Sequence, residues 1–434
     1  MTTQFSQFGL NPKLVQAVTE RGFSAPTPIQ AKAIPAVMAR KDVMGLAQTG
    51  TGKTAAFMLP ILDRLNGGLP GRIRALVLAP TRELAEQIRQ ETLDYARGLN
   101  LRTITIYGGV SKGPQISALR KGAEIVIACP GRLLDLMGEG RVDLKYVEVF
   151  VLDEADRMCD MGFLPDVRRI VAKLPVKRQT LFFSATMPAD ARLLAQSILK
   201  DPLTVQAGNL VPVETVSHAL YPVPQTQKKD LLLALLERTA TGRVLIFTRT
   251  KHRARNLARD LEKSGYRVSA LQGNMSQPQR QRSIDGFRHG KVDFLVATDI
   301  AARGIDVSEI SHVINFDMPD TVDAYTHRIG RTGRAEQSGL AFTLTSEGDE
   351  ALVRDVEKTL GKRIERRQVE GFAYAGFSKE NSAVHKAPAG AGRQATRPKA
   401  VANGYAAMNG RTYRPNRSNA QRSAGSAKGR TNRR

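Results

Sequence analysis

The sequence predicts an α/β protein made of two tandem, doubly wound parallel-sheet domains followed by a disordered basic C-terminal tail. Three observations support this prediction. Short apolar runs alternate with helical periodicity through the first 370 residues, the pattern starts again after residue 217, and the last 64 residues follow neither period. Such alternation is typical of parallel sheets that carry helices on both faces.

The first domain is expected to span residues 1–206. Its apolar runs read as buried parallel strands, because they are short and rich in β-branched residues. The predicted strands are 75–80, 124–130, 147–153 and 180–185, with a helix at 81–97.

A linker is expected at 207–217, where two prolines interrupt a stretch without periodicity. The second domain should then span 218–370. Its predicted strands are 243–248, 294–298 and 312–317, with a helix at 252–265. Two such domains in tandem imply a cleft between them.

The tail, 371–434, contains 13 Lys and Arg against one acidic residue, Glu380, so it carries +12, half of the net charge of +24. Its composition cannot bury a core, which predicts disorder. Aromatic residues among the basic ones suit stacking and phosphate contacts with single strands. These residues are Phe372, Tyr374, Phe377, Tyr405 and Tyr413.

The charge of the whole chain favours a polyanionic partner, nucleic acid above all. Two other interpretations are a basic protein kept soluble by its charge and a protein bound to anionic lipid. The longest apolar run, 231–236, is far too short to span a membrane, and the N-terminus does not resemble a secretory signal. Cys129 and Cys159 have no metal-ligand spacing. We therefore expect a soluble, cytoplasmic chain with no membrane partner.

The run AQTGTGKT at 47–54 follows a short predicted strand and precedes a helical pattern that starts at Thr54. A turn in this position directs successive backbone N–H groups at phosphates. It predicts an ATP site in which Lys53 reaches the β and γ phosphates and the Thr54 hydroxyl binds Mg²⁺. Ala47 stands where the strict motif has glycine. The other nucleotide-binding positions are Gln48, Thr49, Gly50, Thr51 and Gly52.

Acidic residues follow the predicted strand at 147–153, at the edge where doubly wound folds bind ligands. We expect Asp153 to hold Mg²⁺, directly or through water, and Glu154 to orient and polarise the attacking water. Phosphoryl transfer also needs positive charge near the γ-phosphate, and HRIGRTGR at 327–334 offers it from the second domain. Arg331 and Arg334 are therefore candidate arginine fingers, an effect worth roughly 10³–10⁵ in rate.

The motifs closely resemble those of the DEAD-box RNA helicases over roughly residues 5–365, which implies two RecA-like domains. The run DEADRMCDMGF and the phrase FTRTKH are most similar to the bacterial RhlE-type group. The family motifs stand, in order, at 22–30, 47–54, 80–84, 108–109, 130–132, 153–156, 184–186, 244–250, 277–280, 296–306 and 327–334.

The resemblance implies roles for further residues. Gln30 would read adenine, Phe23 would stack on the base, and Asp299 would contact the ribose. Ser184 and Thr186 would link the ATP site to RNA binding through the DEAD segment, which includes Asp156, and His327 would couple cleft closure to hydrolysis. The implied RNA contacts are Arg82, Gly109, Gly131, Arg132, Arg280, Thr298 and Gly304. Glycines and arginines suit backbone recognition, which carries little sequence information.

The chain departs from the family pattern at three places: Cys129 replaces a threonine, Cys159 replaces an apolar residue, and Gln272 stands where HG is frequent. Only the first bears on RNA affinity. The expected activity is ATP-dependent local unwinding of RNA by cleft closure, with hydrolysis for release.

Two other classes of protein use the same two-domain ATPase arrangement: an ATP-gated RNA clamp and a DNA-directed helicase. The DEAD tetrad and the PTPIQ motif argue against the second. The target is not specified, because ribosome assembly, RNA decay and cold adaptation all fit a bacterial member.

Overall fold

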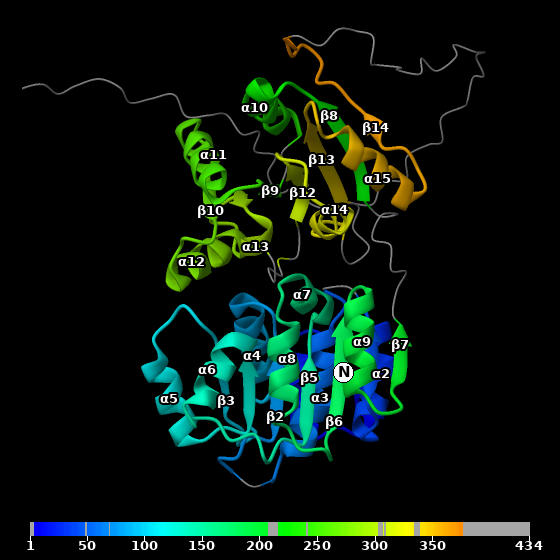
Figure 1. Cartoon of the computed structure of the whole chain (residues 1–434), viewed down its shortest axis with the longest axis vertical. Coiled ribbons are helices and arrows are strands. Elements are labelled where there is room, and N and C mark those ends of the chain that lie inside the picture. Colours follow the sequence, from blue (N-terminus) through cyan, green and yellow to red (C-terminus); the bar gives the residue numbers. More distant parts are fainter. Residues whose placement is uncertain are drawn as a thin grey trace, which may run out of the picture.

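The computed structural model describes residues 4–47, 50–68, 70–206, 216–239, 242–302, 307, 310–333 and 339–375. Figure 1 shows two α/β domains, one above the other, each built on a sheet with helices on its faces. The predicted fold class is confirmed. The residues after 375 lie outside the described part, so the expectation of a disordered tail is not tested by the structure.

The first domain is built on a seven-stranded parallel sheet in the order β3-β4-β2-β5-β6-β1-β7. The strands are β1 (Val43–Leu46), β2 (Ala75–Leu78), β3 (Thr103–Ile106), β4 (Ile125–Ala128), β5 (Val149–Leu152), β6 (Gln179–Ser184) and β7 (Leu203–Gln206). Alternate residues of one strand enter different cores: Val149 and Val151 pack on one face of the sheet, and Phe150 and Leu152 pack on the other. Both faces are therefore buried, as parallel sheets require.

Helices cover both faces of this sheet. The core that contains Val149 is closed by α1 (Pro12–Glu20), α2 (Pro28–Met38), α3 (Lys53–Leu65) and α4 (Arg82–Tyr95), with a short 3₁₀ helix at Gln4–Phe8. The core that contains Phe150 is closed by α5 (Lys112–Lys121), α6 (Pro130–Gly138), α7 (Ala155–Asp160), α8 (Leu164–Val171) and α9 (Ala189–Ile198).

The second sheet, β10-β11-β9-β12-β13-β8-β14, is also parallel and repeats the strand order of the first with every number raised by seven. Its strands are β8 (Val216–Pro222), β9 (Arg243–Phe247), β10 (Val268–Leu271), β11 (Phe294–Ala297), β12 (Ile310–Asn315), β13 (Gly339–Thr345) and β14 (Glu365–Arg366). The helices are α10 (Lys228–Thr239), α11 (Lys251–Lys263), α12 (Gln277–Arg288), α13 (Asp299–Ala302), α14 (Val322–Ile329) and α15 (Glu350–Leu360), with a 3₁₀ turn at Gln225–Gln227.

Every strand predicted from the sequence is present. Other strands of the structure were not predicted, because their sequences have no distinct apolar pattern. β3 and β10 lie at sheet edges, where side chains are only partly buried, so their apolar signal is weak. β8 begins at Val216 and pairs with β13, so the last two residues of the expected linker belong to the second sheet. Residues 207–215 lie outside the described part.

The second domain also extends past the expected boundary at residue 370. Phe372 and Tyr374 pack on its core, and their rings contact each other at 4.8 Å between centroids. The Tyr374 hydroxyl accepts a hydrogen bond from the backbone N–H of Val369, and the Gln227 amide bonds both Ala373 and Ala375. The interpretation of these two aromatic residues as part of a free tail is therefore wrong.

Candidate active site

The loop that joins β1 to α3 places a cation at the carboxyl end of the first sheet. Gly52, before the first residue of α3, has a φ of 87°, a left-handed conformation that glycine adopts at little cost. A Cβ at this position would lie 2.3 Å from Nε2 of Gln30. Lys53 is buried, and its Nζ donates to the carbonyl of Ala47 at 2.9 Å. The predicted positions Gln48 and Thr49 lie outside the described residues.

The Gln30 amide bridges α2 and this loop. Its Oε1 accepts from the backbone N–H of Thr27 at 2.9 Å, and its Nε2 donates to the carbonyl of Gly52 at 3.1 Å. The Thr27 hydroxyl donates to the carbonyl of Thr51 at 2.8 Å. Thr27 is thus part of the site although the sequence argument did not single it out. Its place as N-cap before PIQ was the available signal.

A cavity of about 220 Å³ brings together eight of the predicted ATP residues, while Thr51 and Asp299 do not line it. Phe23 from the segment before α2 lies on its wall with Gln30. The loop and the acidic segment complete it through Gly50, Gly52, Lys53, Thr54, Asp153 and Glu154. The sequence analysis did not name six of the lining residues, because each is an ordinary helical or turn residue in isolation: Arg21, Ala55, Leu84, Gln87, Glu91 and Tyr95.

The acidic segment follows β5 at the bottom of this cavity. Burial raises the pKa of Asp153 to about 6, although the charge of Lys53 opposes the change. Glu154 has a φ of 52° and forms a buried ion pair with Arg157 at 2.6 Å. Burial would raise the pKa of Glu154, but the charges of Arg157, Lys53 and Arg331 lower it. Glu154 is therefore ionised at neutral pH.

Asp156 ties α7 to the end of β6. Its Oδ2 accepts from the Thr186 backbone N–H at 2.8 Å and from the Thr186 hydroxyl at 2.9 Å. Its backbone N–H donates to the Ser184 hydroxyl at 3.1 Å, which in turn donates to the carbonyl of Thr186 at 2.7 Å. The predicted link from Ser184 and Thr186 to the DEAD segment is therefore a closed hydrogen-bond network.

The second domain brings positive charge to the acidic segment. Arg331, just after α14, is buried and lies near enough to Glu154 to lower the pKa of that carboxyl group. The pKa of His327 is lowered by burial and by the charge of Arg157, which belongs to the first domain. Both predicted residues thus face the first domain. The other predicted finger, Arg334, lies outside the described residues.

Asp299 holds an arginine that the sequence argument left without a role. Its carboxylate accepts two hydrogen bonds of 2.6 Å from Arg328. Arg328 also donates to the carbonyl of Asp317 at 2.7 Å and lies over the Phe247 ring, 5.1 Å from its centroid. The side chain of Asp299 remains partly exposed, at 29%. Arg328 thereby fixes α14, and with it His327, to the carboxyl edge of the second sheet.

Several predicted RNA contacts meet at the carboxyl ends of β2, β3 and β4. A Cβ on Gly109, whose φ is 74°, would collide with the Arg82 guanidinium, so these two residues touch. Arg132 donates to the carbonyl of Val110 at 3.2 Å through two nitrogens. A Cβ on Gly131 would meet open space. These positions form one surface with accessible main chain.

Cys129 lies at the N-cap of α6 and makes no side-chain hydrogen bond there. Burial raises the pKa of its thiol to about 12, so the group is neutral. A threonine hydroxyl could accept from the first turn of α6, and this cysteine does not. The departure noted in the sequence therefore leaves one helix end without a side-chain cap.

The Arg280 guanidinium, predicted from the sequence as an RNA contact, is bonded within the protein in this structure. Its Nε donates to Glu83 of the first domain at 2.7 Å, in an ion pair whose side chains are 10% and 7% exposed. Its other nitrogens donate to the carbonyls of Gln272 and Ala301, each at 3.3 Å. Arg280 thus joins the two domains. Thr298 is buried at the end of β11, and Gly304 lies outside the described residues.

No cluster of three or more His, Cys, Asp or Glu side chains able to hold a metal ion occurs among the described residues. The described helices also include none that is long and apolar enough to cross a membrane.

Comparisons with known proteins agree with this arrangement. Residues 27–194 match the DEAD/DEAH box helicase family, and residues 227–336 match the helicase conserved C-terminal domain. The RNA helicase CrhR of Synechocystis sp. is 43% identical over 368 residues, which cover 84% of this chain and 74% of that protein. The ATP-dependent RNA helicase RhlB of Pseudomonas syringae is 42% identical over 83% of this chain and 94% of that protein.

A solved structure is also similar. Saccharomyces cerevisiae Dbp5 bound to RNA and ADP BeF3 aligns with a TM-score of 0.76 and 32% identity, over 85% of this chain and 96% of that chain.

Proposed function

The chain belongs to the DEAD-box family of ATP-dependent RNA helicases. From this premise we propose what each of its two domains contributes to the reaction. It is an RNA-stimulated ATPase that unwinds or remodels RNA. The first domain holds ATP, and the second domain completes the site by closing on it. The observation that carries the proposal is that Arg331 of the second domain lies within electrostatic range of Glu154 of the first.

ATP would occupy the cavity that Phe23, Gln30 and the loop before α3 enclose. Phe23 offers a ring for stacking, and the Gln30 amide offers one donor and one acceptor, which suit the edge of adenine. The phosphates would lie against the backbone of Gly50, Thr51 and Gly52. Lys53 would then exchange its bond to the Ala47 carbonyl for bonds to phosphate oxygens. Gln48 and Thr49 complete the set, and Asp299 would contact the ribose.

The residues around Asp153 fit a divalent cation. Burial disfavours the ionised form of Asp153, and a bound cation would stabilise that form. Thr54 adds a hydroxyl oxygen in the same cavity. Mg²⁺ held there would neutralise charge on the phosphates. Thr54 and Asp153 would hold the ion, Asp153 directly or through water.

Glu154 would orient the attacking water and take its proton. Arg157 holds the carboxylate in place, and the lowered pKa keeps it ionised. Arg331, and Arg334 beside it in sequence, would stabilise the charge that develops on the transferred phosphoryl group. Because these arginines belong to the second domain, hydrolysis would require closure of the cleft. His327, facing Arg157 and Asp156, would sense that closure.

The network of Asp156, Ser184 and Thr186 would transmit closure to RNA. A shift of α7 at the γ-phosphate would move the end of β6 through the bonds of Asp156 to Thr186. RNA would lie on the surface formed by Arg82, Gly109, Gly131 and Arg132, and on Thr298 and Gly304 of the second domain. Contacts of this kind recognise the sugar–phosphate backbone, and a strand held by both domains would be bent away from duplex geometry.

The same network also suits an ATP-gated RNA clamp, in which hydrolysis only resets binding.

Within the family, the sequences DEADRMCDMGF and FTRTKH support membership of the RhlE-type group. Ribosomal or RNA-decay complexes in the cytoplasm are the settings we propose for a bacterial member. A DNA-directed activity would require stimulation by DNA equal to that by RNA.

The decisive test measures ATPase rate with RNA, with DNA of matched sequence, or with neither. Wild type should be stimulated selectively by RNA. Glu154→Gln keeps an acceptor for Arg157 but lacks the charge needed to take a proton, so turnover should fall at least a hundredfold while ATP-dependent RNA binding persists.

Glu139→Gln, at a surface ion pair with Lys112, is the matched control and should be unaffected. Turnover of the Glu154 variant at the wild-type rate would refute the assignment. A long clamp lifetime without duplex release would favour the clamp.

A further inference from the structure

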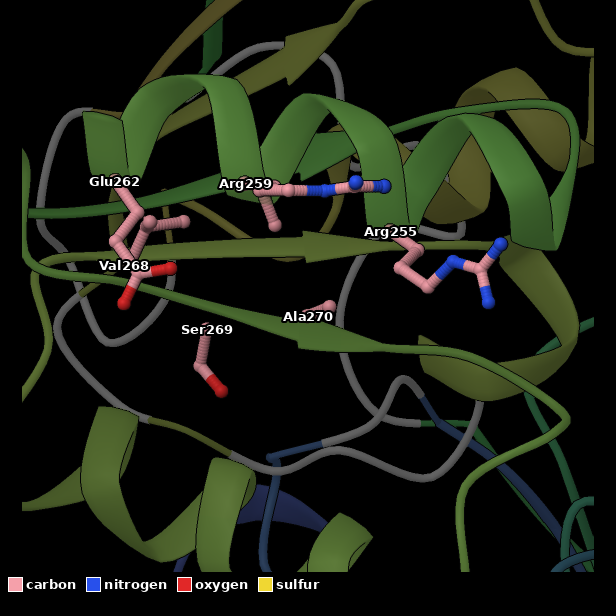
Figure 2. A pocket seen from close by; sticks show the side chains of 7 residues that line it. Arg255, Arg259, Glu262, Val268, Ser269 and Ala270 are labelled. Atoms are coloured by element: carbon pink, nitrogen blue, oxygen red, sulfur yellow. The ribbon is translucent and has the colours of Figure 1, made fainter. Parts of the chain in front are cut away.

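The second domain has a groove that the proposed ATP and RNA sites do not use. Its volume is about 640 Å³, and it runs between α11 and the edge strand β10. We call it the edge groove. Figure 2 shows the helix above the strand, with side chains of both elements bordering the space between them. Its lining consists of Arg255, Ala258, Arg259, Glu262, Val268, Ser269 and Ala270.

The strand side of the edge groove is an open sheet edge. Among the described strands, β10 pairs only with β11 and ends the sheet. The carbonyls of Arg267 and Leu271 accept hydrogen bonds from the residues flanking β11. Backbone groups of a strand alternate in direction, so Val268 and Ala270 direct their N–H and C=O groups away from the sheet. An open edge of this kind is a template for another strand.

The helix side of the edge groove is positively charged over most of its length. Arg255 and Arg259 are one helical turn apart and exposed, and neither forms an ion pair with any carboxylate of the described residues. Arg259 donates to the Asn256 amide at 2.7 Å, which directs its guanidinium along the helix. Glu262, at the far end of the groove, is the one acidic lining residue.

We propose that the edge groove binds an extended acidic segment of a partner protein as an additional strand on β10. The partner's main chain would pair with Val268 and Ala270, and its carboxylates, on every second residue, would contact Arg255 and Arg259. RNA fits less well. A sugar–phosphate chain has no regular N–H donors for the two outward carbonyls, and the groove has no aromatic ring for stacking.

The position of the edge groove makes such docking compatible with activity. In Figure 1, α11 lies on the left flank of the second domain, and α12 and α13 lie between it and the first domain. A bound segment would therefore leave the ATP cavity and the RNA surface free. The occupant would act as a tether that brings the enzyme to its RNA or to a larger assembly.

The test uses the full chain and a fluorescein-labelled ten-residue peptide of alternating threonine and glutamate, with binding followed by fluorescence anisotropy. Two further peptides carry backbone N-methyl groups, one on all threonines and the other on all glutamates. Only one of these two sets can face β10. The proposal therefore expects one methylated peptide to bind at least tenfold more weakly and the other to bind as the parent does. No binding, or equal binding of the two methylated peptides, refutes strand addition.

The helix side is tested with Arg255→Glu/Arg259→Glu, which should weaken peptide binding at least tenfold. Arg282→Glu/Lys291→Glu makes the same change of charge at exposed positions outside the edge groove and should have no effect. Glu262→Gln should tighten peptide binding. If the first pair instead weakens binding of a polyuridine strand and leaves the peptide unaffected, the groove is an RNA surface and the proposal is wrong.

Discussion

Asp153 and Asp156 are both buried carboxylates, yet their surroundings move their pKa values in opposite directions. For Asp153, burial dominates and raises the pKa to about 6. For Asp156, burial is outweighed by the charge of Lys53 and by the hydrogen bonds from Thr186, and the pKa is lowered. The fold therefore opposes ionisation of the proposed metal ligand and favours ionisation of the residue that organises the coupling network. The buried charge of Asp153 therefore lowers the stability of the folded protein at a position proposed to act in the reaction.

Asp153→Asn should stabilise the nucleotide-free protein, since the asparagine keeps the acceptor for the Glu154 N–H without a buried charge. A pKa of about 6 against an ordinary 3.8 corresponds to about 3 kcal/mol at neutral pH. The gain should shrink as the pH falls through 6, because the wild-type carboxyl group then becomes protonated in the folded state. Urea unfolding at pH 7.5 and 5, without Mg²⁺, measures this difference.

Asp156→Asn is the matched control and should destabilise, because its pKa is lowered and its partners are all donors. If both variants changed the free energy of unfolding in the same direction, the opposite pKa shifts assigned to Asp153 and Asp156 would be wrong.

The last described segment of the chain shows how an element boundary is set by packing. Phe372 and Tyr374 are flanked by small and polar residues, so the sequence around them has the composition of a tail. In the structure they pack beside Val369 on the core that α10 and α11 close. Gln227, just before α10, holds the same segment by two hydrogen bonds. The second domain therefore ends no earlier than residue 375.

Truncation after residue 370 should destabilise the second domain by about 2–4 kcal/mol, because two partly buried aromatic side chains are removed. Truncation after residue 375 should leave its stability unchanged. Thermal unfolding of the two truncated chains and of the full chain makes the comparison. Tyr374→Phe isolates the hydrogen bond to Val369 and should cost about 1 kcal/mol. Equal unfolding temperatures for the two truncations would contradict the boundary.

At the scale of the whole molecule, closure depends on charged groups that meet across the cleft. Arg280 and Glu83 form a buried ion pair across it, and Arg331 and His327 add the influence of the second domain on the acidic segment. Each domain alone would leave one member of the buried pair without its partner. The pair should therefore favour the joined arrangement and disfavour others.

A double-mutant cycle on Glu83→Gln and Arg280→Met tests this role. Each single variant leaves a buried group unpaired, so ATP-dependent RNA affinity should fall at least tenfold, and the double variant should lose less than the two losses combined. Arg267→Met/Asp293→Asn, an exposed pair within the second domain, is the control and should leave affinity unchanged. Additive losses would show that the pair does not couple the domains.

Removal of residues 376–434 tests the charge of the tail apart from folding. The removed segment contains the 13 Lys and Arg counted above and one acid, so RNA affinity should weaken and its dependence on salt should become shallower. The ATPase rate at saturating RNA should stay the same. A salt slope equal to that of the full chain would rule out phosphate contacts by the tail.

The sequence by itself determined the two parallel sheets and most of the ATP site. Buried parallel strands are short apolar runs, and a phosphate loop has a fixed order of residues between a strand and a helix, so both are local patterns. Lys53, Asp153 and Glu154 could be assigned from such patterns, and the structure brings them into one cavity.

Only the tertiary structure decided which residues meet across long separations. The pairing of Arg280 with Glu83, the support of Glu154 by Arg157 and the packing of Phe372 on the second core leave no mark in local sequence. An arginine suits a phosphate and a carboxylate equally well, so residue type alone could not separate an RNA contact from a bond between domains. The edge groove could not be predicted from local sequence either. Which strand edge stays unpaired depends on the order of the strands in the sheet.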